Sequence, residues 1–553
     1  MVTSGETKAQ LHASLEEFAA EFWRWRAGTQ PFSPDDISRL ERPGGVRDWS
    51  AAAVAGRRKE LAGFEERWRK MESGSWSVSD QVDYRLLGSA LARVRWEMDV
   101  LRRWERDPNF YLEQTLTAVQ EALTVPAPYD GAQSREILER IENIPAILNA
   151  AKQNLNNPPA PFATLAIRAL EDIRERLNLM NATLRPHTTL FPSQLGRAGD
   201  RATDALEGYR EWLREQVPSL PRETAIGRDA YVFFLSRVAL MPFTPEELLA
   251  MGRQELERAI AFEQIERNRN AQVAALEIAP DMETEMRRSV AAEDAIRKFL
   301  VQRKILTVPD GVAHYTIAPI PAYLKALDGF GEMIDFTSPS RLNENARRYL
   351  DSPSEKLGYF WLATAKDPRP DMVHEGVPGH YFQFALSWRH ANAIRRHFYD
   401  SGANEGVAFY AEEMMLQAGL FDDSPRSREI IYNFARLRAL RVEVDIKLAL
   451  GTFNIEQAAD YLERIVPMDR ETARHEAAFF ATGPGQAITY QIGKLQVLKF
   501  LADARLKFGN DFSLREFHDS LWLNGNAPIA LQRWELLGLR DEVDRLDQIA
   551  SGR

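Results

Sequence analysis

The sequence predicts a mainly α-helical fold with a small β-sheet in its second half. Up to about residue 300, apolar residues recur at helical spacing, as in Leu87, Leu91 and Val94, and charged residues fill the other face. Residues 304 to 372 instead carry β-branched and aromatic runs bounded by Gly and Pro, which is typical of short strands and loops. The 553 residues are enough to bury a large core and an interior cleft.

Capping residues predict where several helices begin. Thr244 is followed by a proline and then by acids, which favours a helix start at this point. Ser424 precedes another long helical pattern, and two capping boxes are predicted at Asn454/Gln457 and Ser513/Glu516. Within the region of strands, the run GYFWLATA is predicted to be a strand, either along a cleft or in the core.

Charge and composition restrict the classes of partner. The chain has 80 acidic and 70 basic side chains, a net charge of −10, and no cluster of Lys and Arg with interleaved aromatics, so nucleic acid is not an expected partner. The first residues have no basic and apolar leader, and no run of about 18 apolar residues occurs. We therefore expect a cytoplasmic protein that does not bind membranes, with its oligomeric state open.

The absence of cysteine directs the search for a metal site to histidines and carboxylates. In MVHEGVPGHYFQ, residues 372 to 383, His374 and His380 are 380 − 374 = 6 positions apart. On a regular helix this spacing turns them about 120° from one another and separates them by about 9 Å along the axis. The intervening Pro and Gly favour a break or bulge that returns both imidazoles to one face. The alternative is a pair of surface or capping histidines.

A catalytic zinc site needs a third ligand from another segment. Glu405 follows His380 by 405 − 380 = 25 residues, in SGANEGVAFYAEEMM, where Asn404 is predicted to be the N-cap of an apolar helix. Glu375 would then be free to act as the general base that takes a proton from water. The alternative for Glu405 is an acid in a first helical turn, stabilised by the helix dipole without any further role.

Other side chains near these motifs have both a functional and a structural interpretation. Glu412 lies two turns beyond Glu405 and could hydrogen-bond to a metal ligand, or remain a solvated charge. Tyr490 follows the loop ATGPGQ and could stabilise an oxyanion, or pack in the core. Arg441 and Asp445 are four apart on a predicted helix, so an ion pair between them is the default expectation.

Five segments together resemble one known family. VHEGVPGHYFQ, NEGVAFYAEE, RVEVD, PGQAITYQIG and FSLREFHDSLWLNGNAP occur in this order and are similar to segments of the DUF885 family, described as bacterial zincin-like metallopeptidases of largely helical fold. The likeness covers about the last 200 residues well and the first half loosely. It implies a zinc site of His374, His380 and Glu405, with Glu375 as general base, in a cleft between helical halves.

The resemblance also implies a division of the chain and some departures from the family. We expect a helical N-terminal subdomain at residues 1–300 and a zincin-like catalytic subdomain at residues 301–553, joined in one compact unit with a central cleft. The family's Trp, His and Arg-Tyr positions are occupied here by Val407, Ala449 and Phe479. We predict that these three positions face the substrate and have become apolar.

The sequence therefore favours a zinc-dependent hydrolase that cleaves short peptides or small amides. Glu375 would be the general base and Tyr490 would stabilise the oxyanion, with the metal held by two histidines and Glu405. One alternative is a non-catalytic peptide- or metabolite-binding protein with a structural or vestigial metal site. Another is a helical scaffold in which the motif is coincidental. The preferred side chains, and endo- against exo-cleavage, are left open.

Overall fold

The computed structural model describes residues 4–33, 41–42, 46–71 and 73–550. It confirms a mainly α fold with a small sheet. The first thirteen α-helices are Ser4–Thr29, Ala51–Arg69, Val78–Arg95, Arg103–Arg106, Pro108–Leu112, Ala118–Thr124, Gly131–Asn154, Ala160–Ala169, Ile173–Leu184, Pro192–Gln216, Arg228–Phe233, Pro245–Arg269 and Met282–Gln302 (α1 to α13). The remaining thirteen are Ala322–Lys325, Tyr359–Lys366, Arg369–Asp371, His380–Ser387, Ala393–His397, Ser401–Ala418, Pro425–Ala449, Ile455–Ile465, Arg470–Thr482, Ile488–Phe508, Leu514–Leu523, Ile529–Leu537 and Asp541–Ala550 (α14 to α26).

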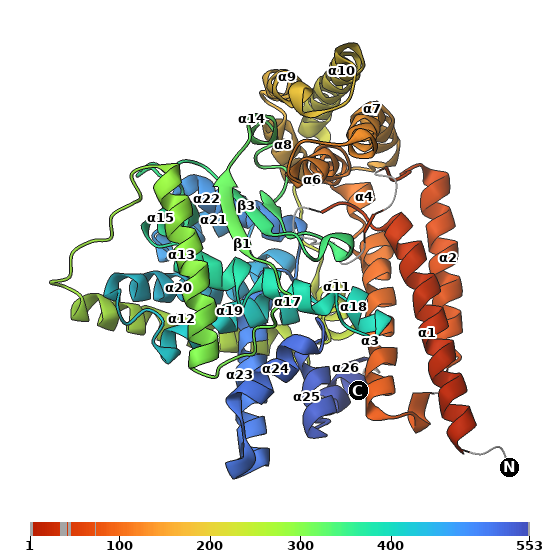
Figure 1. The fold of residues 1–553 in the computed structure, drawn as a ribbon. Helices are drawn as coiled ribbons and strands as arrows, with labels where there is room; N and C mark the ends of the chain where they lie inside the picture. The colour runs from red at the N-terminus through yellow and green to blue at the C-terminus, as the bar shows by residue number, and fades with distance from the viewer. Residues whose placement is uncertain (1–3, 34–40, 43–45, 72, 551–553) are drawn as a thin grey trace.

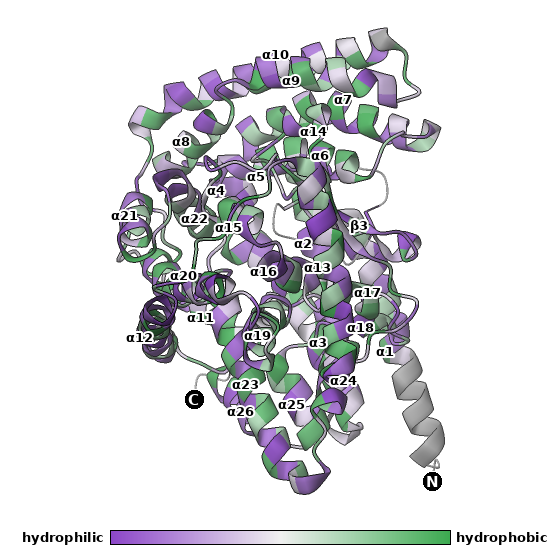
Figure 2. Cartoon of the chain, turned by 60° about the vertical axis from the view of Figure 1, so that its left-hand side comes forward, coloured by the Kyte–Doolittle hydropathy of each residue, from purple (hydrophilic) through white to green (hydrophobic). Residues whose placement is uncertain are grey.

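The helices form groups that surround the middle of the chain. Helices α1 to α3 run side by side at one edge, α7 to α10 lie together at the top of the view, and α17 and α19 lie near the centre (Figure 1). Purple and green residues alternate along single helices such as α10 and α23 (Figure 2), as expected when one face of each helix is buried. No described helix is long and apolar enough to cross a membrane.

The two halves of the sequence share packing surfaces. Helix α12 lies along α20, and one hydrophobic cluster joins residues of α1 and α3 to Leu531 and Trp534 of α25. A buried ion pair adds to this contact, because Arg395 of α18 lies 2.8 Å from Asp83 of α3. The subdomain boundary at residue 300 stays a prediction.

The sheet has three short strands, β1 (Tyr315–Pro319), β2 (Ile334–Asp335) and β3 (Ala346–Leu350). Strand β3 is central, parallel to β1 and antiparallel to β2. The predicted strand GYFWLATA is wrong, because these residues form helix α15. As a helix, the segment places the Trp361 ring 4.9 Å from the guanidinium of Arg348, so aromatic residues that suggested a strand instead cover a buried cation.

The predicted helix starts are largely confirmed. Thr244 and Glu247 exchange hydrogen bonds at the start of α12, and Asn454 and Gln457 do so at the start of α21. Ser424 is the N-cap position of α20. Ser513 accepts a hydrogen bond from the backbone of Glu516, which is one half of the predicted capping box.

Candidate metal centre

The helix around the first histidine is broken as the sequence predicts. Residues Met372–Gly376 form a π-helical turn (η8), in which the Val377 amide donates to the Met372 carbonyl at 2.9 Å, and helix α17 then begins at His380. Gly379 is required at this break, since a Cβ at that position would lie 1.7 Å from the His374 carbonyl oxygen. The wider turn and the break bring the two imidazoles together, with ring centroids 4.8 Å apart.

The three predicted metal ligands converge. One carboxylate oxygen of Glu405, Oε2, lies 3.4 Å from Nε2 of His374 and 3.2 Å from Nε2 of His380. All three side chains are buried. Burial alone would raise the pKa of Glu405, but the two imidazoles outweigh it and hold that pKa well below its usual range.

Helix α19 brings Glu405 to this position through close contact with α23. A Cβ on Gly406 would lie 2.5 Å from the backbone of Gly493, so the two helices touch backbone to backbone. The predicted helix start is wrong, because Asp400 is the N-cap and Asn404 lies inside the helix. Asn404 instead donates to Gln383 of α17, so it holds α17 against α19.

A carboxylate and a guanidinium lie behind His374. Oε1 of Glu412 lies 2.7 Å from Nδ1 of His374, and Glu412 is completely buried. Arg438 of α20 lies 2.9 Å from the same carboxylate oxygen. Burial and Arg438 act to lower the pKa of His374, but Glu405 and Glu412 outweigh them and raise it to about 9. Glu412 is therefore a buried residue in contact with His374 and not a solvated charge, while a role in supporting a metal ligand stays a prediction.

Glu375 lies beside the cluster and pairs with the sheet. Its Oε1 is 3.1 Å from Nη1 of Arg348 on β3, and Asp371 lies 3.2 Å from the same nitrogen. Burial acts to raise the pKa of Glu375, but Arg348 and the imidazoles of His380 and His374 outweigh it and lower that pKa. Glu375 is therefore ionised at neutral pH and able to accept a proton.

Tyr490 also lies at the cluster, on the first turn of α23. Its ring stacks on that of His374, with centroids 6.3 Å apart and planes 11° apart. The guanidinium of Arg441 lies 4.7 Å from the centre of the Tyr490 ring. The structure thus places Tyr490 at the cluster and not in a remote core.

The predicted ion pair between Arg441 and Asp445 is wrong. Arg441 pairs with Glu476 of α22, with both contacts at 2.7 Å. Asp445 accepts hydrogen bonds from the backbone amides of Gly485 and Ala487, both at 2.8 Å, so it holds the loop that leads to Tyr490. Spacing along one helix could not predict this, because the partners come from other elements.

The residues present fit a zinc ion. Two imidazoles and one carboxylate are a common ligand set for catalytic zinc, and their donor atoms all lie within 4.8 Å of one another. Oε2 of Glu405 is buried and forms no hydrogen bond with the residues described, although it points at two ring nitrogens. The contact of Glu412 with Nδ1 leaves Nε2 of His374 for a metal, which is the usual arrangement behind a metal-bound histidine.

Two neighbouring cavities open beside the cluster. The Glu332 cavity, of about 330 Å³, is lined by charged residues together with Phe336, whose ring meets that of His380 edge-on at 6.5 Å. The tryptophan cavity, of about 210 Å³, lies among α1, α3 and the loop before Tyr490. Ser33 lines both cavities, so they meet there.

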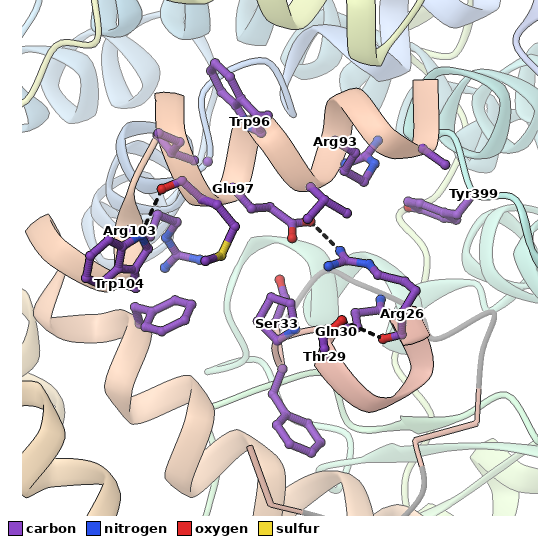
Figure 3. Close-up of a pocket in the computed structure, with 18 of the residues that line it drawn as sticks. Arg26, Thr29, Gln30, Ser33, Arg93, Trp96, Glu97, Arg103, Trp104 and Tyr399 are labelled. Carbon is purple, nitrogen blue, oxygen red and sulfur yellow. Dashed lines mark hydrogen bonds and ion pairs between the residues drawn. The ribbon is translucent and has the colours of Figure 1, made fainter. Parts of the chain in front are cut away.

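The tryptophan cavity combines aromatic walls with two ion pairs. Figure 3 shows Trp96 and Trp104 on its walls and the contact between Arg26 and Glu97, whose length is 2.6 Å. Arg103 and Glu113 form the second pair, also at 2.6 Å. Its aromatic lining is formed by Phe22, Trp23, Trp25, Phe32, Trp49, Trp96, Trp104, Phe110, Phe234, Phe398, Tyr399 and Phe479. Such a lining favours an apolar or aromatic group of a ligand.

The three positions that depart from the family have different environments. Phe479 lines the tryptophan cavity, as expected of a residue that faces a ligand. The prediction is wrong for Val407 and Ala449, which are 1% and 2% exposed and belong to hydrophobic clusters. These two residues fill the core and do not line either cavity.

Sequence reasoning missed Arg348, Arg438 and Glu332. Arg348 and Arg438 lie on a strand and a helix far from the motif in sequence, and no spacing rule links them to it. A weak signal existed for Arg438, since it lies three residues before Arg441 on a helix that is otherwise rich in buried apolar residues. For Arg348 and Glu332 we find none.

The fold and the cluster define a class: a mainly helical protein with a buried His-His-Glu group, a glutamate beside it and two cavities in its neighbourhood. The sequence matches the DUF885 family, described as "Bacterial protein of unknown function", over residues 38–535, and the chain belongs to this family. No curated protein matches the sequence.

Two solved structures share the fold. One is described as a "putative lipoprotein of unknown function" from Shewanella oneidensis; it is 16% identical, with a TM-score of 0.69 over 97% of this chain and 100% of that chain. The other, described as a "putative lipoprotein" from Colwellia psychrerythraea, is 17% identical, with a TM-score of 0.71 over 99% of this chain and 100% of that chain. At these identities the likeness concerns the fold alone.

Proposed function

We propose that the protein is a zinc-dependent hydrolase that cleaves peptide or related amide bonds. The observation that carries this proposal is the convergence of His374, His380 and Glu405, with the carboxylate of Glu375 beside them. The three convergent side chains would hold the ion. Zn²⁺ bound there would supply a Lewis acid that lowers the pKa of water and polarises a carbonyl group.

Glu375 takes the proton from the attacking water and passes it to the leaving amine. Its lowered pKa keeps it ionised at neutral pH, so it is ready to accept that proton. Arg348 lies 3.1 Å from one carboxylate oxygen of Glu375, and its positive charge favours the ionised carboxylate. Arg348 is buried and Glu375 is half-buried, so we assign this pair to the reaction geometry and not to the surface.

Tyr490 stabilises the oxyanion that develops on the scissile carbonyl. Its stacking on His374 places the phenol beside the ligand cluster, and Arg441 lies against the ring. A hydroxyl donor that is already in position loses little free energy to reorganisation when charge develops. Asp445 supports this role indirectly, because it holds the loop that precedes Tyr490.

The cavities favour small substrates. Ligand sites of a few hundred Å³ enclose a few residues of a peptide, and the two cavities here measure about 330 and 210 Å³. A folded protein chain would not reach a cluster whose three ligands are all buried. We therefore propose short peptides or small amides as the substrates.

The test is to compare wild type with Glu375→Gln and His374→Ala on a library of short peptides and amides, with zinc measured in each protein by mass spectrometry. We expect about one zinc per chain in wild type and Glu375→Gln, little in His374→Ala, and hydrolysis only in wild type. Zinc binding without turnover of any substrate would favour a binding protein. Full activity in Glu375→Gln would exclude the general base named here.

A further inference from the structure

Glu332 is an acid beside the cluster that lacks a partner. Its carboxylate lines the Glu332 cavity and is exposed to it, and it forms no hydrogen bond or ion pair with the part of the chain that the structure describes. Three other acids of this cavity pair with arginines: Glu136 with Arg140 at 2.5 Å, Asp335 with Arg341 at 2.6 Å, and Glu121 with Arg42. A fourth, Glu41, accepts a hydrogen bond from the Ser340 amide at 2.9 Å. Glu332 is therefore the acid of this cavity whose charge no described neighbour neutralises by direct contact.

Glu332 lies just before the strand that is next to Arg348. Ile334 of β2 pairs with Arg348 of β3, and the Met333 carbonyl accepts from the Tyr349 amide at 2.8 Å. Glu332 lies two residues before Ile334, and the guanidinium of Arg348 contacts Glu375 at 3.1 Å, so Glu332 leads into the part of the sheet that borders the proposed general base.

Electrostatics agrees with this placement. Desolvation by the cavity walls, together with the negative charge of Glu375 and Glu405, raises the pKa of Glu332 to about 7, although Arg348 opposes the shift.

A carboxylate in this position fits a cation carried by the substrate. An ammonium group is a compact charge with three donors, and it would supply the partner that Glu332 lacks. A cation bound by Glu332 would lie on the Glu375 side of the cluster, because β2 pairs with β3 and Arg348 of β3 contacts Glu375. The α-amino group of a peptide is only a few atoms from its first carbonyl, whereas the ammonium of a lysine side chain is several bonds further away.

We propose that Glu332 binds the free α-amino group of a peptide, so that the protein acts at peptide N-termini. This inference rests on the proposed hydrolase function for its consequence, exo-cleavage, but the binding step can be tested by itself. It adds a specificity residue that no motif in the sequence indicates.

The experiment measures binding in a Glu375→Gln background, which blocks turnover. Zinc-loaded protein is titrated calorimetrically with trialanine and with propionyl-dialanine, which differs from trialanine only in lacking the amino group. The same titrations are made with the double variant that carries both Glu375→Gln and Glu332→Gln. The matched control is Glu136→Gln, which removes an acid of the same cavity that is already paired with Arg140.

We expect trialanine to bind about tenfold or more tightly than propionyl-dialanine, as for a hydrogen bond to a charged group. The preference should fall below about threefold with Glu332→Gln and persist with Glu136→Gln, while zinc content stays unchanged in both. Equal binding of the two ligands, binding of neither, or a preference that survives Glu332→Gln overturns the inference, and so does loss of zinc from Glu332→Gln. A preference found in a wild-type protein that hydrolyses nothing would refute only the proposed function.

Discussion

Two charged residues contact Nδ1 of His374 and leave its Nε2 facing Glu405. The Glu412 carboxylate lies 2.7 Å from Nδ1, and Nη2 of Arg438 lies 3.3 Å from it, whereas Nε2 is 3.4 Å from Glu405. A buried carboxylate behind a histidine also increases the basicity of the imidazole as a ligand.

We predict that Glu412→Gln weakens zinc binding about 10- to 100-fold, because the neutral amide supports the imidazole less well. Competition with a chromophoric chelator would measure the affinity. The matched control is Glu413→Gln, the next residue on α19, which pairs with Lys494 at 2.7 Å and not with a ligand. An affinity that falls equally in both variants would show that only the stability of the helix had changed.

At the residue scale the sequence predicted the side chains that converge, but not the residues that surround and support them. His374, His380, Glu405 and Glu375 lie in local motifs, and metal chemistry limits the residue types that can serve. Arg348 and Arg438 approach from β3 and α20, so their contacts depend on tertiary packing that no local spacing encodes.

At the scale of elements, glycine sets the position of the third ligand. Helices α19 and α23 carry Glu405 and Tyr490, and they touch where a Cβ on Gly493 would lie 2.2 Å from the Gly402 carbonyl oxygen. No side chain could be inserted there without separating the helices.

We predict that Gly493→Ala lowers the free energy of unfolding by about 1 to 3 kcal/mol, the usual cost of overpacking, and also weakens zinc binding. Chemical unfolding with saturating zinc and a chelator titration would measure the two effects. Gly208→Ala on α10 is the control, since nothing lies within 4 Å of its Cβ, and it should be neutral or stabilising. If Gly493→Ala left the zinc affinity unchanged, the contact between the two helices would not be needed to position Glu405 for zinc binding.

The loop before Tyr490 is held by Asp445. Burial raises the pKa of Asp445 from 3.8 to about 7, although the hydrogen bonds from the loop amides act to lower it. The folded protein therefore binds this proton more tightly than the unfolded chain does. The stabilising contribution of the proton is complete below about pH 4 and is lost as pH rises through about 7.

We predict that Asp445→Asn removes this part of the pH dependence of stability. It should also loosen the loop, because the side-chain NH2 of asparagine cannot accept hydrogen bonds from the backbone amides that Asp445 binds. Melting temperatures of wild type and variant between pH 4 and 8 would test this. The gap between the two curves should change with pH, and parallel curves would contradict the raised pKa.

Secondary-structure elements were predicted well where the helical pattern of apolar residues ran over many residues, and poorly where the segment was short. Helices such as α12 and α20 begin at the predicted caps. The segment GYFWLATA was predicted as a strand because its residues favour strands, yet it forms a helix whose Trp361 ring lies over Arg348.

At the scale of the whole molecule, a bound ion would couple two consecutive segments to a third that begins about 20 residues further on. Its ligands come from η8, α17 and α19, and these pack on the sheet and on α20 and α23. Binding to the folded state alone must then stabilise the entire fold.

We predict that zinc at about 100 times its Kd adds about 2.7 kcal/mol to the free energy of unfolding, and that a chelator reverses the effect. Thermal unfolding with and without zinc would measure it. His380→Ala should abolish the zinc dependence, whereas His475→Ala, at an exposed position on α22, should retain it. Zinc stabilisation that survives His380→Ala would place the ion elsewhere.

The backbone contact between α19 and α23 has a consequence for motion. Because Gly402, Gly406 and Gly493 leave no side chain between the two helices, Glu405 and Tyr490 belong to one rigid body. Any hinge that admits substrate or releases product therefore lies outside this pair. The N-terminal helices and the segment around β2, which line the two cavities, are outside this rigid pair.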